Sequence, residues 1–329
     1  MKLTLEQIRS IALGVARVEE TDGRIHLMRF TKAQELMYKE RQTDFYEKTF
    51  ATAGVTLEFE TDSRCLGLSL EVTQASSRKF FNHSIFVNGN RIGEVYGEME
   101  KGVTLACEKS FTLGEGMKRV EILFPWSAAS CICAMTLDDG AVLRPVQKKC
   151  TMLQFGDSIT HGYDALLPEN SYASQIAHWL DANAINKAIG GEVFCPALAQ
   201  LQDAVQPELI TVAYGTNDWS KTGRQVFQEN SLEFYRSLRK HYPGAKIVAL
   251  APIWRADMDL EKPAGLFRDV ARHLASIARE VENMEFVDCF DFVPKDPQYF
   301  MDLRLHPNDA GFAHYSDGLR RQLTALGLK

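Results

Sequence analysis

Residues 151–160 read TMLQFGDSIT, an apolar run followed by a turn that carries a glycine, an aspartate and a serine. The run at 152–155 has no polar alternation, which is typical of a strand buried on both faces of a parallel sheet. Ser158 follows this expected strand directly. Because ligands of open α/β sheets bind beyond the carboxyl ends of the strands, Ser158 is well placed to present its hydroxyl to one.

Strand and helix patterns alternate from this point to the C-terminus, which predicts a βαβ series with a parallel sheet. The expected strands are 152–155, 184–188, 209–214, 246–251 and 285–289, and the expected helices are 172–180, 226–241, 266–281 and 310–323.

In the first half of the chain, apolar residues follow a different spacing. Residues 55–59, 66–70 and 120–124 alternate between apolar and polar side chains, and turn signals such as NGN at 88–90 separate the expected strands. Short strands at this spacing predict a β-sandwich that is jelly-roll-like, and a short leading helix is expected over residues 4–18. We therefore expect a sandwich domain at 1–148 and an α/β domain at 149–329.

Length, charge and cysteine content limit the classes of function that the protein can have. A length of 329 residues is too great for one ordinary core, and the net charge of −6 argues against a nucleic acid or an anionic membrane as partner. No signal peptide and no apolar run of about 20 residues is evident, so a cytoplasmic location is expected. The seven cysteines are scattered, and Cys131 and Cys133 are their only close pair. No second close pair of cysteines or histidines completes a zinc site, so neither metal nor cofactor is expected. The sequence predicts no oligomeric state.

Three more polar islands follow other expected strands or enter the last expected helix. They are NKAIGG at 186–191, GTND at 215–218 and DLRLHPN at 302–308. Glycine exposes its N–H to a ligand, an asparagine amide can donate to an oxyanion, and Pro307 favours extended backbone at His306. With Ser158, these residues supply the parts for acyl transfer through a serine nucleophile.

Each island taken alone also fits a purely structural role. Ser158 fits a turn or the start of a short helix, Asn217 an Asx-turn, the glycine pair a strand-ending turn, and His306 a solvated loop. The ordered set favours catalysis.

The islands, in this order, resemble the sequence blocks of the SGNH (GDSL-like) hydrolases, whereas the G-x-S-x-G elbow of the α/β-hydrolases is absent. The resemblance implies a flavodoxin-like three-layer α/β/α fold. It also implies Ser158 as nucleophile and His306 as general base and then general acid. The oxyanion hole would consist of the N–H groups of Ser158 and Gly191 and the side chain of Asn217.

One position departs from the family pattern. The family aspartate precedes the histidine by three residues, but that position is Leu303 here, and Asp302 lies four residues before His306. Either the loop accommodates the extra residue and Asp302 still reaches His306, or backbone carbonyls orient the ring, as in Ser–His dyads. We expect Asp302 to be the third catalytic residue.

The β-rich half placed before an SGNH domain resembles the family 2 carbohydrate esterases. That likeness implies a serine esterase acting on O-acyl, mainly acetyl, esters of carbohydrates or small molecules. Trp254, Arg255 and Trp219 follow expected strands and are candidate substrate contacts, although a packing role fits them equally. The alternatives are a lysophospholipase or thioesterase, and a non-catalytic glycan-binding protein.

Overall fold

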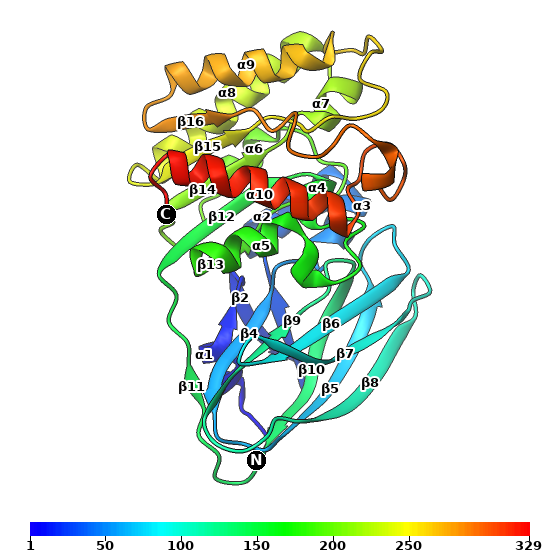
Figure 1. The fold of residues 1–329 in the computed structure, drawn as a ribbon, viewed down its shortest axis with the longest axis vertical. Coiled ribbons are helices and arrows are strands. Elements are labelled where there is room, and N and C mark those ends of the chain that lie inside the picture. Colours follow the sequence, from blue (N-terminus) through cyan, green and yellow to red (C-terminus); the bar gives the residue numbers. More distant parts are fainter.

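The computed structural model describes residues 1–329 and places a parallel sheet with its helices next to a β-sandwich (Figure 1). The five parallel strands lie in the order β13-β12-β14-β15-β16, with the β13 edge toward the sandwich. Their bounds are β12 Cys150–Gly156, β13 Ala182–Asn186, β14 Leu209–Ala213, β15 Lys246–Leu250 and β16 Met284–Val287. The strand order reverses between β12 and β14, as in flavodoxin-like folds, so the predicted fold is confirmed.

Side chains of β12 alternate between the two faces of the sheet. Leu153 and Phe155 join a core with α8 and α9, whereas Met152 joins a core with α5 and α10. The helices are α4 Ser158–His161, α5 Tyr172–Leu180, α6 Pro196–Gln200, α7 Thr216–Lys221, α8 Arg224–His241, α9 Phe267–Glu280 and α10 Asp309–Ala325, with 3₁₀ turns η1 Pro168–Asn170 and η2 Pro297–Tyr299. The four long predicted helices are confirmed to within two residues at each end, and the short α6 and α7 were not expected.

Two antiparallel sheets form the sandwich. One contains β1 Ala12–Leu13, β4 Thr56–Thr61, β9 Lys118–Leu123, β6 Phe80–Val87 and β7 Asn90–Glu98, with β11 Arg144–Pro145 beside β4. The other contains β2 Arg17–Thr21, β3 Arg24–Met28, β10 Ala128–Leu137, β5 Cys65–Gln74 and β8 Thr104–Thr112. Strands β6 and β7 form a hairpin at the NGN turn signal, and both turn residues, Asn88 and Gly89, have positive φ.

The leading helix is shorter than predicted. Helix α1 spans Leu5–Ile11 and begins with a capping box between Thr4 and Gln7. The chain then enters β1, and Gly14 adopts φ +73° where a Cβ would lie 2.4 Å from the carbonyl oxygen of Gly54. The expectation of helix up to residue 18 is therefore wrong, because pairing with β4 extends the backbone.

Two helices of the first half, α2 Lys32–Arg41 and α3 Thr43–Thr49, were not expected. Helix α2 buries Gln34, Glu35 and Tyr38, so its buried face has almost no apolar periodicity. Phe30, Tyr38 and Phe45 nevertheless join the core with α8 and α9, and Trp126 of the sandwich joins the core with α5 and α10. The two halves of the chain thus share both cores around the parallel sheet.

The helices offer no membrane span, because none of them is both long and apolar enough. The cytoplasmic location stays a prediction.

Candidate active site

Ser158 is held in a tight turn between β12 and α4. Asp157 caps α4, its Oδ1 accepting the N–H of Ile159 at 3.0 Å. Gly156 ends the strand, and a Cβ there would lie 2.1 Å from Oγ1 of Thr160, so only glycine fits. Ser158 is therefore the first residue of α4, at the carboxyl end of β12.

His306 lies on a hairpin-like loop before α10. The N–H of Met301 donates to the carbonyl oxygen of His306 at 2.8 Å, and Asn308 caps α10. Oδ1 of Asp302 accepts the N–H groups of Arg304, Leu305 and His306. This network fixes the loop without regular secondary structure.

The serine, the histidine and the aspartate form one hydrogen-bonded chain. Oγ of Ser158 lies 2.8 Å from Nε2 of His306, and Nδ1 of His306 lies 2.9 Å from Oδ2 of Asp302. Burial alone would raise the pKa of Asp302, but hydrogen bonds from the His306 ring and from the N–H groups of Leu305 and His306 lower it well below its ordinary value. An ionised Asp302 holds the proton on Nδ1, which leaves Nε2 free to accept the serine proton.

Leu303 accounts for the unusual spacing. Its φ of +59° lies in the left-handed region, which leucine seldom adopts. The extra residue is thus absorbed in a tight turn, and Asp302 reaches the ring from four residues upstream. Of the two alternatives that the sequence left open, the geometry matches the one with Asp302.

The three expected oxyanion donors follow neighbouring strands. Ser158 follows β12, Gly191 follows β13 and Asn217 follows β14. The N–H of Gly190 donates to Nδ1 of His161 at 3.2 Å, whereas the N–H of Gly191, at φ +92°, has no acceptor in the protein. Nδ2 of Asn217 donates one hydrogen to the carbonyl oxygen of Glu192 at 3.0 Å, so its other hydrogen is available to a ligand.

His161, although close to Ser158 in sequence, serves the scaffold. Its Nε2 lies 3.0 Å from the carbonyl oxygen of Trp126, and its Nδ1 accepts from Gly190. Burial lowers the pKa of His161 well below its ordinary value, so the ring is neutral and can accept the glycine N–H. It thereby links the Gly190–Gly191 turn to Trp126 of the sandwich.

Two buried carboxyl groups lie in the same sequence blocks as the candidate catalytic residues. Burial raises the pKa of Asp157 to about 6 and that of Asp218 to about 7. Oδ1 of Asp218 accepts the N–H of Phe194 at 3.1 Å, and its Oδ2 has no partner. The neutral acid is therefore favoured at Asp218 below neutral pH.

Trp219 and Arg255 are not placed against a substrate. Trp219 is 0% exposed, and its Nε1 donates to the carbonyl oxygen of Gly265. Arg255 is 4% exposed, packs over the Trp219 ring and donates to Thr216 and Asp257. The structure therefore does not support the expected substrate contact for either residue, because α7 begins after β14 and turns Trp219 into the core.

Trp254 is half-buried and packs on Phe300, with the ring centroids 5.4 Å apart. Phe300 begins the loop that carries His306, so Trp254 supports this loop.

Residues of the first half that the sequence did not predict hold the loops of the candidate site. Arg29 donates to the carbonyl oxygens of Asn186 and Ala188, and Lys48 donates to that of Gly190 at 2.9 Å. No sequence motif marks either residue, and only their burial in the folded chain reveals them.

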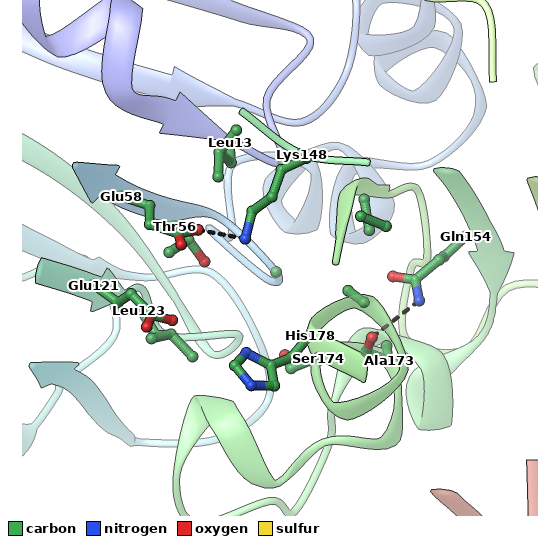
Figure 2. A pocket seen from close by; sticks show the side chains of 15 residues that line it. Leu13, Thr56, Glu58, Glu121, Leu123, Lys148, Gln154, Ala173, Ser174 and His178 are labelled. Carbon is green, nitrogen blue, oxygen red and sulfur yellow. Dashed lines mark hydrogen bonds and ion pairs between the residues drawn. The ribbon is translucent and has the colours of Figure 1, made fainter. Parts of the chain in front are cut away.

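A cavity of about 60 Å³ lies between the sandwich and α5 (Figure 2). Lys148 pairs there with Glu58 at 2.6 Å, and Glu121 and His178 are among the other polar residues of the lining. None of the candidate catalytic residues lines it, and its volume suits one or two water molecules rather than a substrate.

One group of side chains has the geometry of a metal site: Glu71, Cys131 and Cys133, in the sandwich. Arg24, however, donates to both carboxylate oxygens of Glu71, at 2.6 and 2.8 Å. Burial also raises the pKa of Cys131 to about 11, which keeps its thiol protonated at neutral pH. The arrangement therefore favours an arginine–carboxylate pair over a bound metal.

Comparison with known proteins agrees with this geometry. The profile of the GDSL-like lipase/acylhydrolase family matches residues 155–314, whereas no curated protein matches the sequence.

Solved structures with the same fold include salicylyl-acyltransferase SsfX3 from a tetracycline biosynthetic pathway. It is 20% identical, with a TM-score of 0.82, over 96% of this chain and 94% of that chain. A family two carbohydrate esterase from Cellvibrio japonicus is 17% identical, with a TM-score of 0.69, over 99% and 97%. Another from Clostridium thermocellum, in complex with cellohexaose, is 18% identical, with a TM-score of 0.64, over 84% and 94%. Residues 155–314 thus form a GDSL-like lipase/acylhydrolase domain, and the protein is a carboxylic ester hydrolase.

Proposed function

We propose that the protein hydrolyses O-acyl esters through an acyl-enzyme on Ser158. The observation that carries the proposal is the continuous relay from Oγ of Ser158 through His306 to Asp302, with contacts of 2.8 and 2.9 Å. This is the geometry that a serine nucleophile needs, because its hydroxyl is unreactive until a base removes the proton.

The first half-reaction forms the acyl-enzyme. Nε2 of His306 takes the proton of Ser158 while Oγ attacks the ester carbonyl carbon, and the carbonyl oxygen becomes an oxyanion. The N–H groups of Ser158 and Gly191 and the amide of Asn217 donate to that oxyanion. When the C–O bond to the alcohol breaks, His306 returns the proton to the departing oxygen.

Water then repeats the sequence on the acyl-enzyme, with His306 again as base and then acid, and releases the carboxylic acid. Asp302 stays ionised throughout, because its pKa lies well below the ordinary value, and it stabilises the imidazolium ion.

We propose acetyl esters of carbohydrates or of small molecules as substrates. The proposal is supported by the likeness over nearly the whole chain to structures described as family two carbohydrate esterases. Transfer of the acyl group to an alcohol other than water is a second candidate, favoured by the likeness to a salicylyl-acyltransferase over 96% of this chain. Both reactions pass through the same acyl-enzyme.

The test combines labelling with chain-length preference. We expect a fluorophosphonate probe to label the wild-type protein and the control Ser276→Ala, whose exposed serine lies on α9, but not Ser158→Ala. Nitrophenyl acetate should be hydrolysed faster than the octanoate, whereas the reverse would favour a lysophospholipase or thioesterase. An unlabelled, folded wild-type protein would instead favour the glycan-binding alternative.

A screen of acetylated sugars for acetate release then identifies the alcohol. Addition of a competing acceptor alcohol distinguishes transfer from hydrolysis, because transfer yields a new ester in place of free acid.

A further inference from the structure

An arginine of the sandwich reaches the neighbourhood of His306. Arg78 lies in the loop between β5 and β6, and its Nε and Nη2 donate to the two carboxylate oxygens of Asp164 at 2.6 and 2.8 Å. Such a bidentate pair fixes both side chains in one plane. The Asp164 side chain is 4% exposed, so the pair is largely shielded from water on the carboxylate side.

Asp164 in turn faces the same ring nitrogen as Asp302. Its Oδ2 lies 3.6 Å from Nδ1 of His306, against 2.9 Å for Oδ2 of Asp302. Asp164 adopts φ +72°, a left-handed conformation that directs this short loop after α4. The imidazole thus has two carboxylates on its Nδ1 side, and only Asp302 is within hydrogen-bond distance.

Aromatic packing joins the same groups. The ring of Tyr163 packs on the His306 ring with centroids 5.9 Å apart, and the Arg78 guanidinium lies 5.4 Å from the centre of the Tyr163 ring. Trp126 of the sandwich also packs on the Tyr163 ring, with the centroids 4.8 Å apart, and its Nε1 donates to the carbonyl oxygen of Ala165 at 2.8 Å. The sandwich therefore braces the loop 163–165 at two points, Arg78 and Trp126.

We propose that Arg78 is a positioning residue for the reaction of the other domain: by pairing with Asp164 it sets the charge beside Nδ1 of His306. The inference rests on the proposed function, since it concerns the base of that reaction. It also gives the sandwich a role in chemistry in addition to any role in substrate binding.

The physical reason is charge balance. The charged groups around His306 are Asp302 on its own loop, Asp164 after α4, Asp157 in the turn before α4, and Arg78 from the sandwich. An unpaired carboxylate beside an imidazole stabilises the protonated ring, which cannot act as a base. Arg78 neutralises the acid that lies outside hydrogen-bond distance, so that Asp302 alone orients the ring.

The experiment measures the pH dependence of kcat/KM for nitrophenyl acetate. In Arg78→Met the unpaired Asp164 carboxylate stabilises the imidazolium ion. We therefore expect the acidic limb of the kcat/KM profile to shift to higher pH by about half a unit or more. Arg78→Lys keeps the charge and should leave the limb near its wild-type position, with a smaller loss of kcat. Asp164→Asn removes the added negative charge, and the double variant Arg78→Met/Asp164→Asn should return the limb toward wild type.

Arg91→Met is the matched control. Arg91 is also a sandwich arginine, and its Nε lies 3.4 Å from Glu169 of the other half, but neither residue contacts His306. Its acidic limb should not move. Thermal unfolding of each variant identifies any that fails to fold, and Arg78→Lys and Asp164→Asn keep the proposal testable if Arg78→Met does not fold.

An unchanged acidic limb in folded Arg78→Met, or a double variant that shows no return, would reduce Arg78 to an ordinary interdomain contact. Labelling of Ser158 separates this result from failure of the proposed function. A labelled, active wild-type protein with an unmoved limb overturns only the role of Arg78, whereas an unlabelled and inactive wild type overturns the esterase proposal itself.

Discussion

Oδ2 of Asp302 lies 2.9 Å from Nδ1 of His306 although Asp302 precedes His306 by four positions rather than by three. The left-handed turn at Leu303 takes up the added residue, and Oδ1 of Asp302 collects three N–H groups of the loop. One carboxylate therefore both folds the loop and orients the ring. A substitution at Asp302 can therefore affect both the fold of the loop and the orientation of the ring.

We expect Asp302→Asn to lower kcat by a factor of about 10⁴, as in serine enzymes whose aspartate fixes the histidine tautomer. The asparagine oxygen can still accept the loop N–H groups, so the loop should persist while the tautomer is lost. Nitrophenyl acetate kinetics measure the loss, and circular dichroism checks the fold. A decrease of less than about tenfold would instead support a Ser–His dyad.

Asn217→Ala should lower kcat by a factor of about 10² to 10³, with little change in KM, because an oxyanion donor acts mainly in the transition state. Ser220→Ala is the control, since Oγ of Ser220 contacts only the carbonyl oxygen of Asn217. Steady-state kinetics on one ester measure kcat and KM of both variants. Equal effects of the two substitutions would assign Asn217 to the structure of α7.

Arg29→Lys should lower the free energy of unfolding by about 2 to 4 kcal/mol. The buried Arg29 donates to carbonyl oxygens of Ala51, Lys48, Asn186 and Ala188, and burial lowers its pKa to about 9, so it remains charged at neutral pH. A lysine ammonium cannot reach all of these acceptors.

Urea unfolding at neutral pH measures this difference, and Arg9→Lys on the exposed face of α1 should show none. Equal stability of Arg29→Lys and the wild type would mean that water replaces the missing donors.

The buried Asp218 makes stability depend on pH. Its pKa is about 7 in the folded protein against an ordinary 3.8, so the folded state binds the proton more tightly than the unfolded state. Stability from this group is therefore full below about pH 4, falls as the pH rises to about 7, and is constant above that.

Asp218→Asn should remove this loss and be more stable than the wild type at pH 8 by about 1 to 3 kcal/mol, with no difference near pH 4. The asparagine Oδ1 can still accept the N–H of Phe194. Urea unfolding at the two pH values is the measurement. A variant equally or less stable at pH 8 would show that Asp218 is solvated or charged without cost.

Local pattern was enough to predict the parallel sheet and the position of Ser158. The buried strands appear as apolar runs, and glycine, asparagine and proline mark where the chain turns, so the residues at strand ends could be read in order. Position at a strand end does not fix the direction of a side chain, however. Trp219 was expected at the site and is buried, because α7 begins there and packs its ring under Arg255.

The sequence by itself thus determined the strands, the long helices of the second half and the residues Ser158, Asn217 and His306 as candidates, because these depend on neighbours in the chain. Only the tertiary structure decided that Asp302 reaches the ring and that Arg29, Lys48 and Arg78 hold the catalytic loops. Arg78 and Asp164 are 86 residues apart. Contacts at such separation arise from the packing of two sheets and their helices, and leave no periodicity in the sequence.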